Sequence, residues 1–202
     1  MRRESLLELH YIAHFDNIIS IYQEGILSHN KAESIPHNSV ASEIIQDRRR
    51  SKSVPGGRHL HDYVNLYIHG RNPMLFKLKH KYGYSELCIL SISPEVLNMP
   101  GVIISSCNAA SDYVLFEPAP EGLDIVDEEL VFARYWTHPD QVEQWRRASI
   151  KCAEVLVPDH VDAEFIAKAY VSCSDSKIML ERIMRDAGLN LNVAVNTYLF
   201  FG

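Results

Sequence analysis

Apolar and polar residues alternate along this chain in short segments, and the period of alternation changes repeatedly between that of a strand and that of a helix. β-branched and aromatic residues dominate the segment 63–68, and similar apolar runs recur on both sides of it. Such runs, bounded by polar or glycine-containing turns, are typical of strands. The pattern predicts strands at residues 9–12, 63–68, 87–92, 102–106, 151–157, 165–171 and 191–200.

Between these runs, apolar residues recur at the three- and four-residue spacing of amphipathic helices. Gly25 follows the first such segment and Gly188 follows the last, and each predicts a helix end. Asn72 and Pro73 predict a helix start, because proline fits the first helical turn. Helices are expected at residues 16–23, 41–50, 73–79, 124–135, 139–147 and 175–186.

The predicted strands come in irregular order with helices interspersed, which favours an α+β fold over a regular parallel α/β sheet. No repeat, linker or low-complexity segment divides the chain, so one domain over residues 1–202 is expected. The sequence contains no G-x-G-x-x-G, P-loop or G-x-S-x-G motif. A bound nucleotide would therefore be held without a Rossmann turn.

The apolar fraction is 47% of 202 residues, which is sufficient for a substantial core. No run reaches the ~20 apolar residues that cross a bilayer, and the N-terminus does not resemble a signal peptide. We expect a cytoplasmic protein without membrane contact. The four cysteines form no C-x-x-C pair, so neither a zinc site nor a disulfide framework is indicated.

The net charge is -6, which argues against a protein that coats duplex nucleic acid by electrostatics alone. Residues 1–81 nevertheless hold 12 Lys and Arg against 8 Asp and Glu, whereas residues 82–202 hold 8 against 18. The densest basic stretch is 48–52, followed by Arg58 and Arg71. A polyanion is expected on that side, although a solvated helix end would give the same pattern.

Glu154 interrupts the apolar members of a predicted strand. Alternation places Ala153 and Val155 on one face and Glu154 with Leu156 on the other. A carboxylate at such a position needs a partner or a function, because an unpaired buried charge is costly. The structural alternative is an edge-strand glutamate that faces water.

Arginine and histidine cluster in the first third of the chain. Arg48, Arg49 and Arg50 follow one another on a predicted helix, where side chains point about 100° apart, so we expect one to face inward. A guanidinium offers a planar fork to a pyrophosphate or carboxylate. Six of the ten histidines also lie here, and His61-Asp62 resembles the dyad of metal-dependent phosphohydrolases, but one dyad is a weak signal and no metal is expected.

The order of several sequence blocks is more specific than any single residue. They lie at 11–18, 25–30, 45–49, 54–57, 60–64, 71–75, 133–136 and 153–157. The blocks Leu-His-Asp-Tyr-Val and Arg-Asn-Pro-Met are fairly specific. In this order the blocks resemble the DarT family, toxins that ADP-ribosylate DNA with NAD and are paired with DarG antitoxins.

This resemblance implies an ADP-ribosyltransferase (PARP-like) fold with a split central β-sheet, peripheral helices and NAD in the cleft. The family's catalytic glutamate corresponds to Glu154, and the arginine of its Ile-Gln-x-Arg-Arg motif corresponds to Arg49. Family members commonly read Tyr-His-Ile-Thr where this chain reads His10-Tyr11-Ile12-Ala13, so His10 and Tyr11 both remain candidates for the nicotinamide ribose. The NAD-binding candidates are His10, Tyr11, Ala13, Gly25, Ser28, His29, Asn30, Tyr67 and Met74.

The chemistry implied by the resemblance passes through an oxocarbenium-like state, whose growing positive charge a carboxylate stabilises. Glu154 would supply that carboxylate, and Arg49 would hold the pyrophosphate or orient Glu154. A base must leave the duplex stack to reach such a site, which favours single-stranded DNA.

The DNA-binding candidates come from the basic stretch and from the segment 105–127, which we expect to select the base. Together with Arg71-Asn72-Pro73-Met74, the residues of that segment resemble the guanine-modifying branch of the family more than the thymine-modifying one. The candidates are Arg48, Arg50, Arg58, Arg71, Asn108 and Ser111. A DarG-type antitoxin with ADP-ribosyl-hydrolase activity is the implied protein partner.

Two other functions stay open at this point. A metal-dependent nuclease or phosphohydrolase could be built around His61-Asp62, and it would be inhibited by chelators and need no NAD. A non-catalytic nucleotide-binding module would use Glu154 only as a structural edge residue, and it would bind NAD without releasing nicotinamide.

Overall fold

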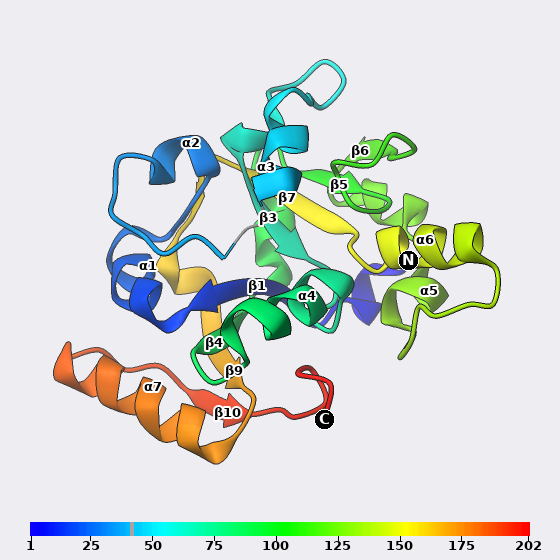
Figure 1. The fold of residues 1–202 in the computed structure, drawn as a ribbon. Helices are drawn as coiled ribbons and strands as arrows, with labels where there is room; N and C mark the ends of the chain where they lie inside the picture. Colours follow the sequence, from blue (N-terminus) through cyan, green and yellow to red (C-terminus); the bar gives the residue numbers. More distant parts are fainter. Residues whose placement is uncertain (41–42) are drawn as a thin grey trace.

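The computed structural model describes residues 1–40 and 43–202, and its main element is an eight-stranded sheet with the order β10-β9-β4-β1-β3-β7-β5-β6 (Figure 1). Neighbouring strands are antiparallel except β9 and β10, which run parallel. A two-stranded sheet pairs β2 with β8. The strands are β1 Leu9–His14, β2 Ile26–Leu27, β3 Tyr63–Tyr67, β4 Leu87–Ile92, β5 Ile103–Ser105, β6 Phe116–Pro118, β7 Glu154–Pro158, β8 His160–Val161, β9 Ile166–Val171 and β10 Val193–Val195.

The sheet is split between β1 and β3. These strands share a single register pair, His10 with Tyr67, whereas β1 pairs with β4 from Leu9 through His14. On the other side, β3 pairs with β7 along its whole length. Beyond the one shared pair β1 and β3 therefore diverge, as the split sheet implied by the sequence requires.

Short helices cover both faces of the sheet. They are α1 Ile18–Glu24, α2 His29–Ala32, α3 Glu43–Arg50, α4 Pro73–Tyr82, α5 Glu128–Phe132, α6 Gln141–Ile150 and α7 Ser174–Asp186. The 3-10 segments are η1 Arg3–Ser5, η2 Phe15–Asn17, η3 Leu60–Asp62, η4 Pro94–Asn98, η5 Glu121–Ile125 and η6 Ala163–Phe165. Figure 1 shows α7 and β10 at one end of the sheet, and β6 with α5 and α6 at the other.

Local sequence signals fix two of the helix ends. The side chain of Asn72 caps α4 by accepting a hydrogen bond from the amide of Leu75 at 3.0 Å, and Pro73 fills the first helical turn. Gly25 ends α1 with φ 78°, and a Cβ there would lie 2.5 Å from the carbonyl oxygen of Val161. Glycine is therefore required both for the backbone conformation and for the close approach of β8.

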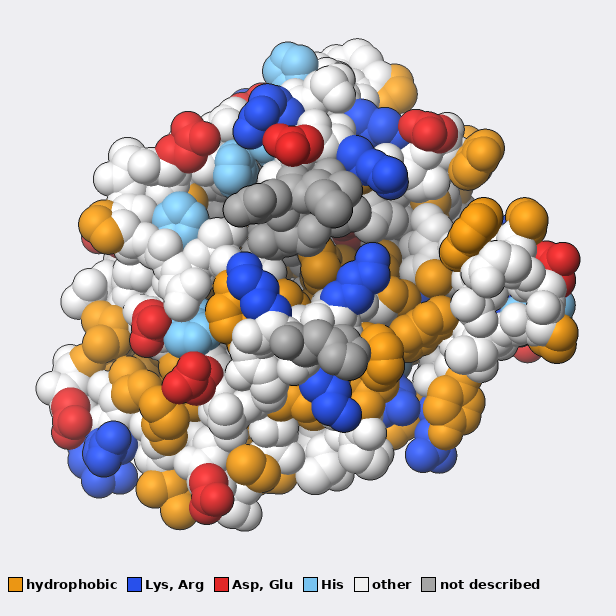
Figure 2. All heavy atoms as spheres, in the orientation of Figure 1, with side chains coloured by type: hydrophobic (Ala, Val, Ile, Leu, Met, Phe, Trp, Pro, Cys, Tyr) orange, Lys and Arg blue, Asp and Glu red, His pale blue; other side chains and the backbone are white. Residues whose placement is uncertain are grey.

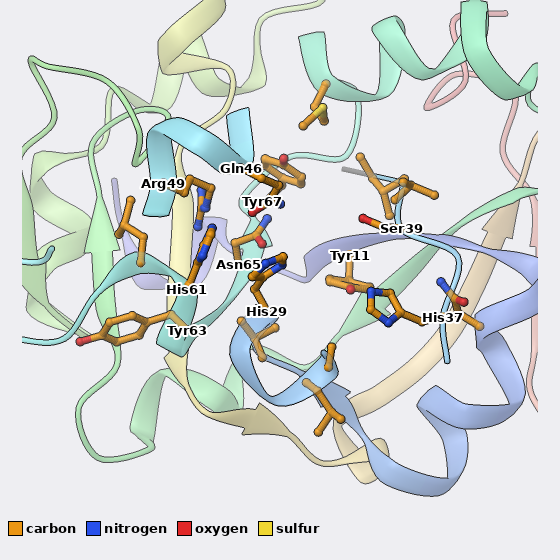
Figure 3. Close-up of a pocket in the computed structure, with 18 of the residues that line it drawn as sticks. Tyr11, His29, His37, Ser39, Gln46, Arg49, His61, Tyr63, Asn65 and Tyr67 are labelled. Atoms are coloured by element: carbon orange, nitrogen blue, oxygen red, sulfur yellow. The ribbon is translucent and has the colours of Figure 1, made fainter. Parts of the chain in front are cut away.

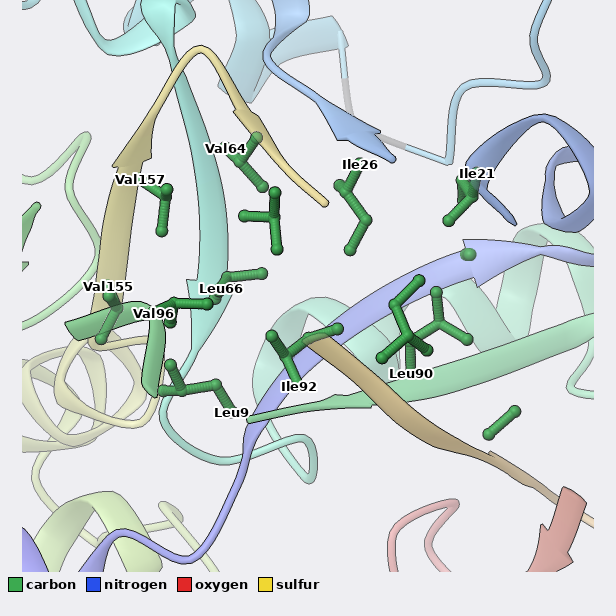
Figure 4. Close-up of a cluster of buried hydrophobic side chains, with 14 of the residues drawn as sticks. Leu9, Ile21, Ile26, Val64, Leu66, Leu90, Ile92, Val96, Val155 and Val157 are labelled. Atoms are coloured by element: carbon green, nitrogen blue, oxygen red, sulfur yellow. The ribbon is translucent and has the colours of Figure 1, made fainter. Parts of the chain in front are cut away.

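Two apolar clusters on opposite faces hold the helices to the sheet. The larger one contains alternate residues of β7, among them Val155 and Val157, together with residues of α1 and α7 (Figure 4). The second joins Leu75 and Leu78 of α4 to the C-terminal turn through Phe200. The alternation of apolar residues predicted for the segment around Glu154 is confirmed, because its neighbours face the larger cluster.

Most predicted elements are confirmed, with three differences that hydrogen bonding explains. The strand predicted at 151–157 begins only at Glu154, because the amides of Cys152 and Ala153 bond back to the end of α6. The strand predicted at 191–200 is confined to β10, because the carbonyl of Thr197 accepts from two later amides in a turn. Asp127 caps α5 through the amide of Leu130, which divides the helix predicted at 124–135.

Three short strands, β2, β6 and β8, and the short helix α2 were not predicted. The pairing of β2 with β8 joins Ile26 to Val161, which lie far apart in the sequence. The helix predicted at 41–50 is confirmed from Glu43, and residues 41–42 lie outside the described part. No helix in the described part of the chain is long and apolar enough to span a bilayer.

Buried cations fasten the segment 131–134 and the C-terminal turn to the sheet. Lys151 is 1% exposed, and its Nζ donates to the carbonyls of Val131 at 2.9 Å and Ala133 at 2.6 Å. Arg71 donates to the carbonyls of Arg134 and Tyr198, and its guanidinium lies 4.8 Å from the Tyr198 ring centroid. These contacts give backbone carbonyls of both segments charged hydrogen-bond donors from the body of the protein.

His69 is the neutral acceptor for one of these cations. Lys151 Nζ lies 3.0 Å from His69 Nδ1, so this nitrogen must be unprotonated to accept. Burial, and then the charge of Lys151, lower the pKa of His69 to about 3. Burial lowers the pKa of Lys151 itself to about 8.

We expect His69 to contribute to acid unfolding. Its pKa is about 6.5 when unfolded and about 3 when folded, so the unfolded chain binds more protons between these values. Stability present above pH 6.5 is therefore lost as the pH falls towards 3, with a slope of up to about 1.4 kcal/mol per pH unit. Urea unfolding across this pH range should show that the free energy of unfolding falls less steeply for His69→Gln than for the unchanged protein. Glutamine keeps an acceptor but does not titrate. Parallel pH profiles for the two proteins would contradict this prediction.

Candidate functional site

A pocket opens where β1 and β3 diverge, and it is lined from both strands (Figure 3). Tyr11 lines it from β1, and Asn65 and Tyr67 line it from β3. Met74 and Leu78 contribute from α4. Its atom-free space is about 960 Å³, open solvent included. The split in the sheet is therefore what creates the candidate site.

An ion pair between Arg49 and Glu154 lies at the wall of this pocket. Arg49 Nη1 is 3.0 Å from Glu154 Oε2 and 3.2 Å from Oε1. The two residues are 5% and 1% exposed. Arg49 lines the pocket, whereas Glu154 is not among the lining residues, so the guanidinium lies between the carboxylate and the pocket.

Glu154 is fixed by the interior of the sheet. β7 lies between β3 and β5, and Glu154 is opposite Tyr67 on one strand and Ser105 on the other. Its amide donates to Ser105 Oγ at 3.0 Å, and its Oε1 accepts from the amide of Ala109 at 3.2 Å. The alternative of an edge glutamate that faces water is wrong, because this strand has neighbours on both sides.

Among the described residues, three polar atoms at the pocket are buried and have no hydrogen-bond partner. They are Arg49 Nη2, His61 Nε2 and Gln46 Oε1, and all three residues line the pocket. Figure 3 shows Arg49 and His61 beside one another on one wall. A buried polar atom without a partner costs about 1–3 kcal/mol, so a polar ligand that bonds to these atoms would recover that free energy.

Next to Arg49, His29 and His61 form a close ring pair. Their centroids are 4.1 Å apart. Burial lowers the pKa of both rings, and for His61 the next causes are His29 and the Arg49 charge. Neutral imidazoles supply hydrogen bonds without charge, so Arg49 carries the positive charge of this wall.

The predicted NAD-binding residues divide into two groups. Tyr11, His29, Tyr67 and Met74 line the pocket, and Gly25 lies in a smaller pocket that shares Tyr11 with it. The others are placed elsewhere: Ala13 and Ser28 are buried, and Asn30 Nδ2 donates to Asp62 Oδ1 at 2.7 Å, a contact that satisfies the amide locally.

His10 and Tyr11 face opposite sides of β1, as neighbours on a strand must. The His10 ring is 4% exposed and lies 6.2 Å from His69 and 6.5 Å from Tyr170, measured between ring centroids. Of these two candidates, the structure brings Tyr11 to the pocket and leaves His10 outside its lining.

The predicted DNA-binding arginines also divide. Arg48 is exposed, whereas Arg50 pairs with Asp47 at 3.3 Å and Arg58 pairs with Asp159 at 2.7 Å. Arg71 is 4% exposed and holds the C-terminal turn. The expectation of a basic surface that includes Arg71 is therefore corrected, because its guanidinium is engaged by carbonyls and aromatic rings.

Asn108 and Ser111 lie on the loop 106–115, which joins β5 to β6 and contacts Glu154 and Lys52, a residue just beyond the end of α3. Asn108 Oδ1 accepts from the amide of Ala110 at 2.8 Å, and the carbonyl of Ser111 accepts from Lys52 Nζ. Lys52 also pairs with Asp112 at 3.0 Å. Because Ala109 of the same loop donates to Glu154, the loop joins the carboxylate to the molecular surface.

The predicted site residues did not include Gln46, Asn65 or Ser105, and His61 was predicted only as a candidate metal ligand. Asn65 carried a usable signal, since it interrupts an apolar strand in the same way as Glu154. Gln46 belongs to the Ile-Gln-x-Arg-Arg block, although only the arginine of that block was given a role. Ser105 carried no signal, because its role depends on its contact with a distant strand. Among the described residues no group of three His, Cys, Asp or Glu side chains could hold a metal ion, and the Asp62 carboxylate is engaged by Asn30.

Residues 10–201 match the model of a protein family described as "ssDNA thymidine ADP-ribosyltransferase, DarT". One similar protein is a DNA ADP-ribosyl transferase-DNA ADP-ribosyl glycohydrolase fusion protein of Thermosipho africanus, 30% identical over 200 residues. The match covers 96% of this chain and 49% of that protein, so the chain spans about half of its length. A DNA ADP-ribosyl transferase of Thermus sp. is 28% identical over 150 residues, which cover 69% of this chain and 71% of that protein.

Two solved structures of DarT proteins are also similar to this chain. Thermosipho africanus DarTG in complex with ADP-ribose has a TM-score of 0.82 at 29% identity, covering 96% of this chain and 51% of that one. Thermus sp. 2.9 DarT in complex with ADP-ribosylated ssDNA has a TM-score of 0.84 at 24% identity, covering 96% of both chains. The predicted ADP-ribosyltransferase fold is confirmed.

Substitutions of Arg49 and Glu154 should have strongly non-additive effects on the free energy of unfolding, because the two side chains form a buried ion pair. Arg49→Met leaves the carboxylate of Glu154 unpaired at 1% exposure, which should lower the free energy of unfolding by about 3–5 kcal/mol. Adding Glu154→Gln should cost little more, because a neutral amide needs no counter-ion. Urea unfolding of both single variants and the double variant measures this coupling, and additive losses would exclude it.

Proposed function

The chain belongs to the DarT family, and from that premise we propose that it transfers ADP-ribose from NAD to a base in single-stranded DNA and releases nicotinamide. We also propose that residues 1–202 form one catalytic domain that acts in the cytoplasm. The observation that carries the proposal is the Arg49–Glu154 pair at the wall of a pocket that also presents unpartnered polar atoms.

The pocket residues fit the two chemical parts of NAD, which is the co-substrate. The unpartnered Nη2 of Arg49 and Nε2 of His61 are suited to pyrophosphate or ribose oxygens. Tyr11, Tyr67 and Met74 provide apolar surface for planar rings. His29 completes this wall as a neutral hydrogen-bonding group.

Glu154 is proposed to act on the bond between nicotinamide and ribose. When this bond breaks, its electron pair leaves with nicotinamide and positive charge develops on the ribose. A preorganised carboxylate stabilises that charge in the transition state. The attacking base nitrogen then bonds to the ribose carbon, and its proton passes to Glu154 or to solvent.

Arg49 covers Glu154 in the structure, and this determines its proposed role. For the carboxylate to contact ribose, the guanidinium must move from Glu154 towards the pyrophosphate, which offers it an equivalent anionic partner. Arg49 would thus exchange one anion for another when NAD binds. The loop 106–115 would bring the base to the same carboxylate, because its Ala109 already contacts Glu154.

Glu154→Gln should lower the rate of ADP-ribosyl transfer by roughly 10²–10³-fold, because it removes the negative charge but keeps the shape. Mass spectrometry of an oligonucleotide incubated with NAD measures the product. Exposed Glu164 is the matched control, and Glu164→Gln should keep full activity. Full activity of Glu154→Gln, or activity that needs a metal and no NAD, would overturn the assignment.

The modified base is proposed to be guanine, on the resemblance of the segment 105–127 to the guanine-modifying branch. Within it, Asn108 and Ser111 lie on the loop that contacts Glu154 and are proposed to face the base. Arg48, which is exposed on the same side, would contact the DNA backbone. The family model is described by its action on thymidine, so thymine is the competing base in the measurement.

Single-stranded oligonucleotides that each contain one modifiable base type should separate these outcomes. After incubation with NAD, only guanine-containing strands are expected to gain the mass of one ADP-ribose. The same sequences annealed to a complement should react more slowly, because the base must leave the stack. A product on thymine-containing strands alone would overturn the guanine assignment while leaving the transferase activity in place.

The proposed protein partner is a DarG-type antitoxin that removes the ADP-ribose again. The Thermosipho africanus relative is described as a fusion of a DNA ADP-ribosyl transferase with a DNA ADP-ribosyl glycohydrolase. This chain covers about half of that protein. A separate or fused hydrolase would therefore complete a toxin–antitoxin pair.

A further inference from the structure

Helix α4 borders the pocket and carries three exposed lysines, Lys77, Lys79 and Lys81. Met74 and Leu78 of this helix line the pocket. Residues three and four positions apart share a helix face, so Lys77 and Lys81 lie on the pocket side with Met74 and Leu78. Lys79 points to another side, where its Nζ lies 5.9 Å from the centroid of the Tyr84 ring.

In the described part of the chain, no Asp or Glu side chain forms an ion pair with Lys77, Lys79 or Lys81. Arg50 and Arg58, from the stretch predicted to follow DNA, each have such a partner. Figure 2 shows basic side chains over α4 as well as over the region of α3 on the same face.

This positive helix stands out because the chain as a whole carries a net charge of -6. An acidic protein repels a polyanion over most of its surface, so a strand is held where unpaired cations gather. Proteins that bind single strands follow the backbone with such cations next to the site that receives a base. The lysines on the pocket side of α4 meet the first condition, and under the proposed function the base must reach the ribose of NAD in the pocket that α4 borders.

We propose that Lys77 and Lys81 bind the phosphates of the DNA strand next to the reacting base, so that the strand runs along α4 at the mouth of the pocket. The inference rests on the proposed function for the identity of the ligand. The lysines of α4, and not Arg58 and Arg71, would then make the main contact with the DNA backbone. The inference also predicts that the position of a lysine on α4, and not its charge alone, decides whether it contributes to DNA affinity.

The test compares K77Q/K81Q with K79Q and with the unchanged protein. Binding of a short fluorescently labelled single-stranded oligonucleotide is measured over a series of KCl concentrations. Loss of two phosphate contacts should weaken binding roughly tenfold and make the slope of log K against log[salt] shallower by about 1.4. K79Q should stay within about twofold of the unchanged protein, because its ammonium lies off the pocket side.

Two further measurements keep this inference separate from the proposed function. NAD affinity, measured by calorimetry without DNA, should be the same in all three proteins, which also shows that each is folded. ADP-ribosyl transfer by K77Q/K81Q should show a raised KM for the oligonucleotide, and added oligonucleotide should restore the rate.

The outcomes are distinct. If the unchanged protein modifies DNA but K77Q/K81Q and K79Q bind the strand equally well, the α4 inference is overturned and the proposed function stands. If the unchanged protein binds single strands through Lys77 and Lys81 but transfers no ADP-ribose, the proposed function fails and the binding surface stands. If it binds no single strand, both are wrong.

Discussion

Arg49 and Glu154 join a short helix to the interior of the sheet through an ion pair that is almost completely buried. Neither charge would be tolerated there alone, because desolvation of an isolated ion costs several kcal/mol. The sheet holds the carboxylate through Ser105 and Ala109, and the carboxylate in turn holds the guanidinium at the pocket wall. Only one of the two Nη atoms is used in the pair, and the other has no partner among the described residues. The geometry of the whole site depends on this contact.

The break between β1 and β3 provides the space for that site. Continuous pairing of these strands would close the sheet and leave no entrance beside Arg49. The strands stay together at His10 and Tyr67, where apolar packing on both faces continues across the join. The cleft therefore exists because most backbone hydrogen bonds between β1 and β3 are not formed.

Charge is distributed unevenly around the cleft, and the distribution follows the elements. Arg49 supplies the charge inside the pocket, while the two histidines next to it are held neutral by burial. Cations on α4 and the end of α3 lie outside it on one face. Other basic residues are used within the fold, as Arg71 and Lys151 are at the C-terminal turn and the segment 131–134. The number of basic residues in the sequence therefore overstates the basic surface that a ligand can reach.

The sequence by itself determined the features that local chemistry controls. Alternation placed Glu154 on the strand face opposite Val155, asparagine and proline began α4, and glycine ended α1. It could not assign partners, because Arg49 meets Glu154 across 105 positions of sequence and His61 meets His29 only through packing. Nor could it decide between His10 and Tyr11, or predict that Arg71 is buried. Those outcomes depend on which face of each strand a neighbouring element covers, and long-range packing of the sheet and helices fixes that only in the folded chain.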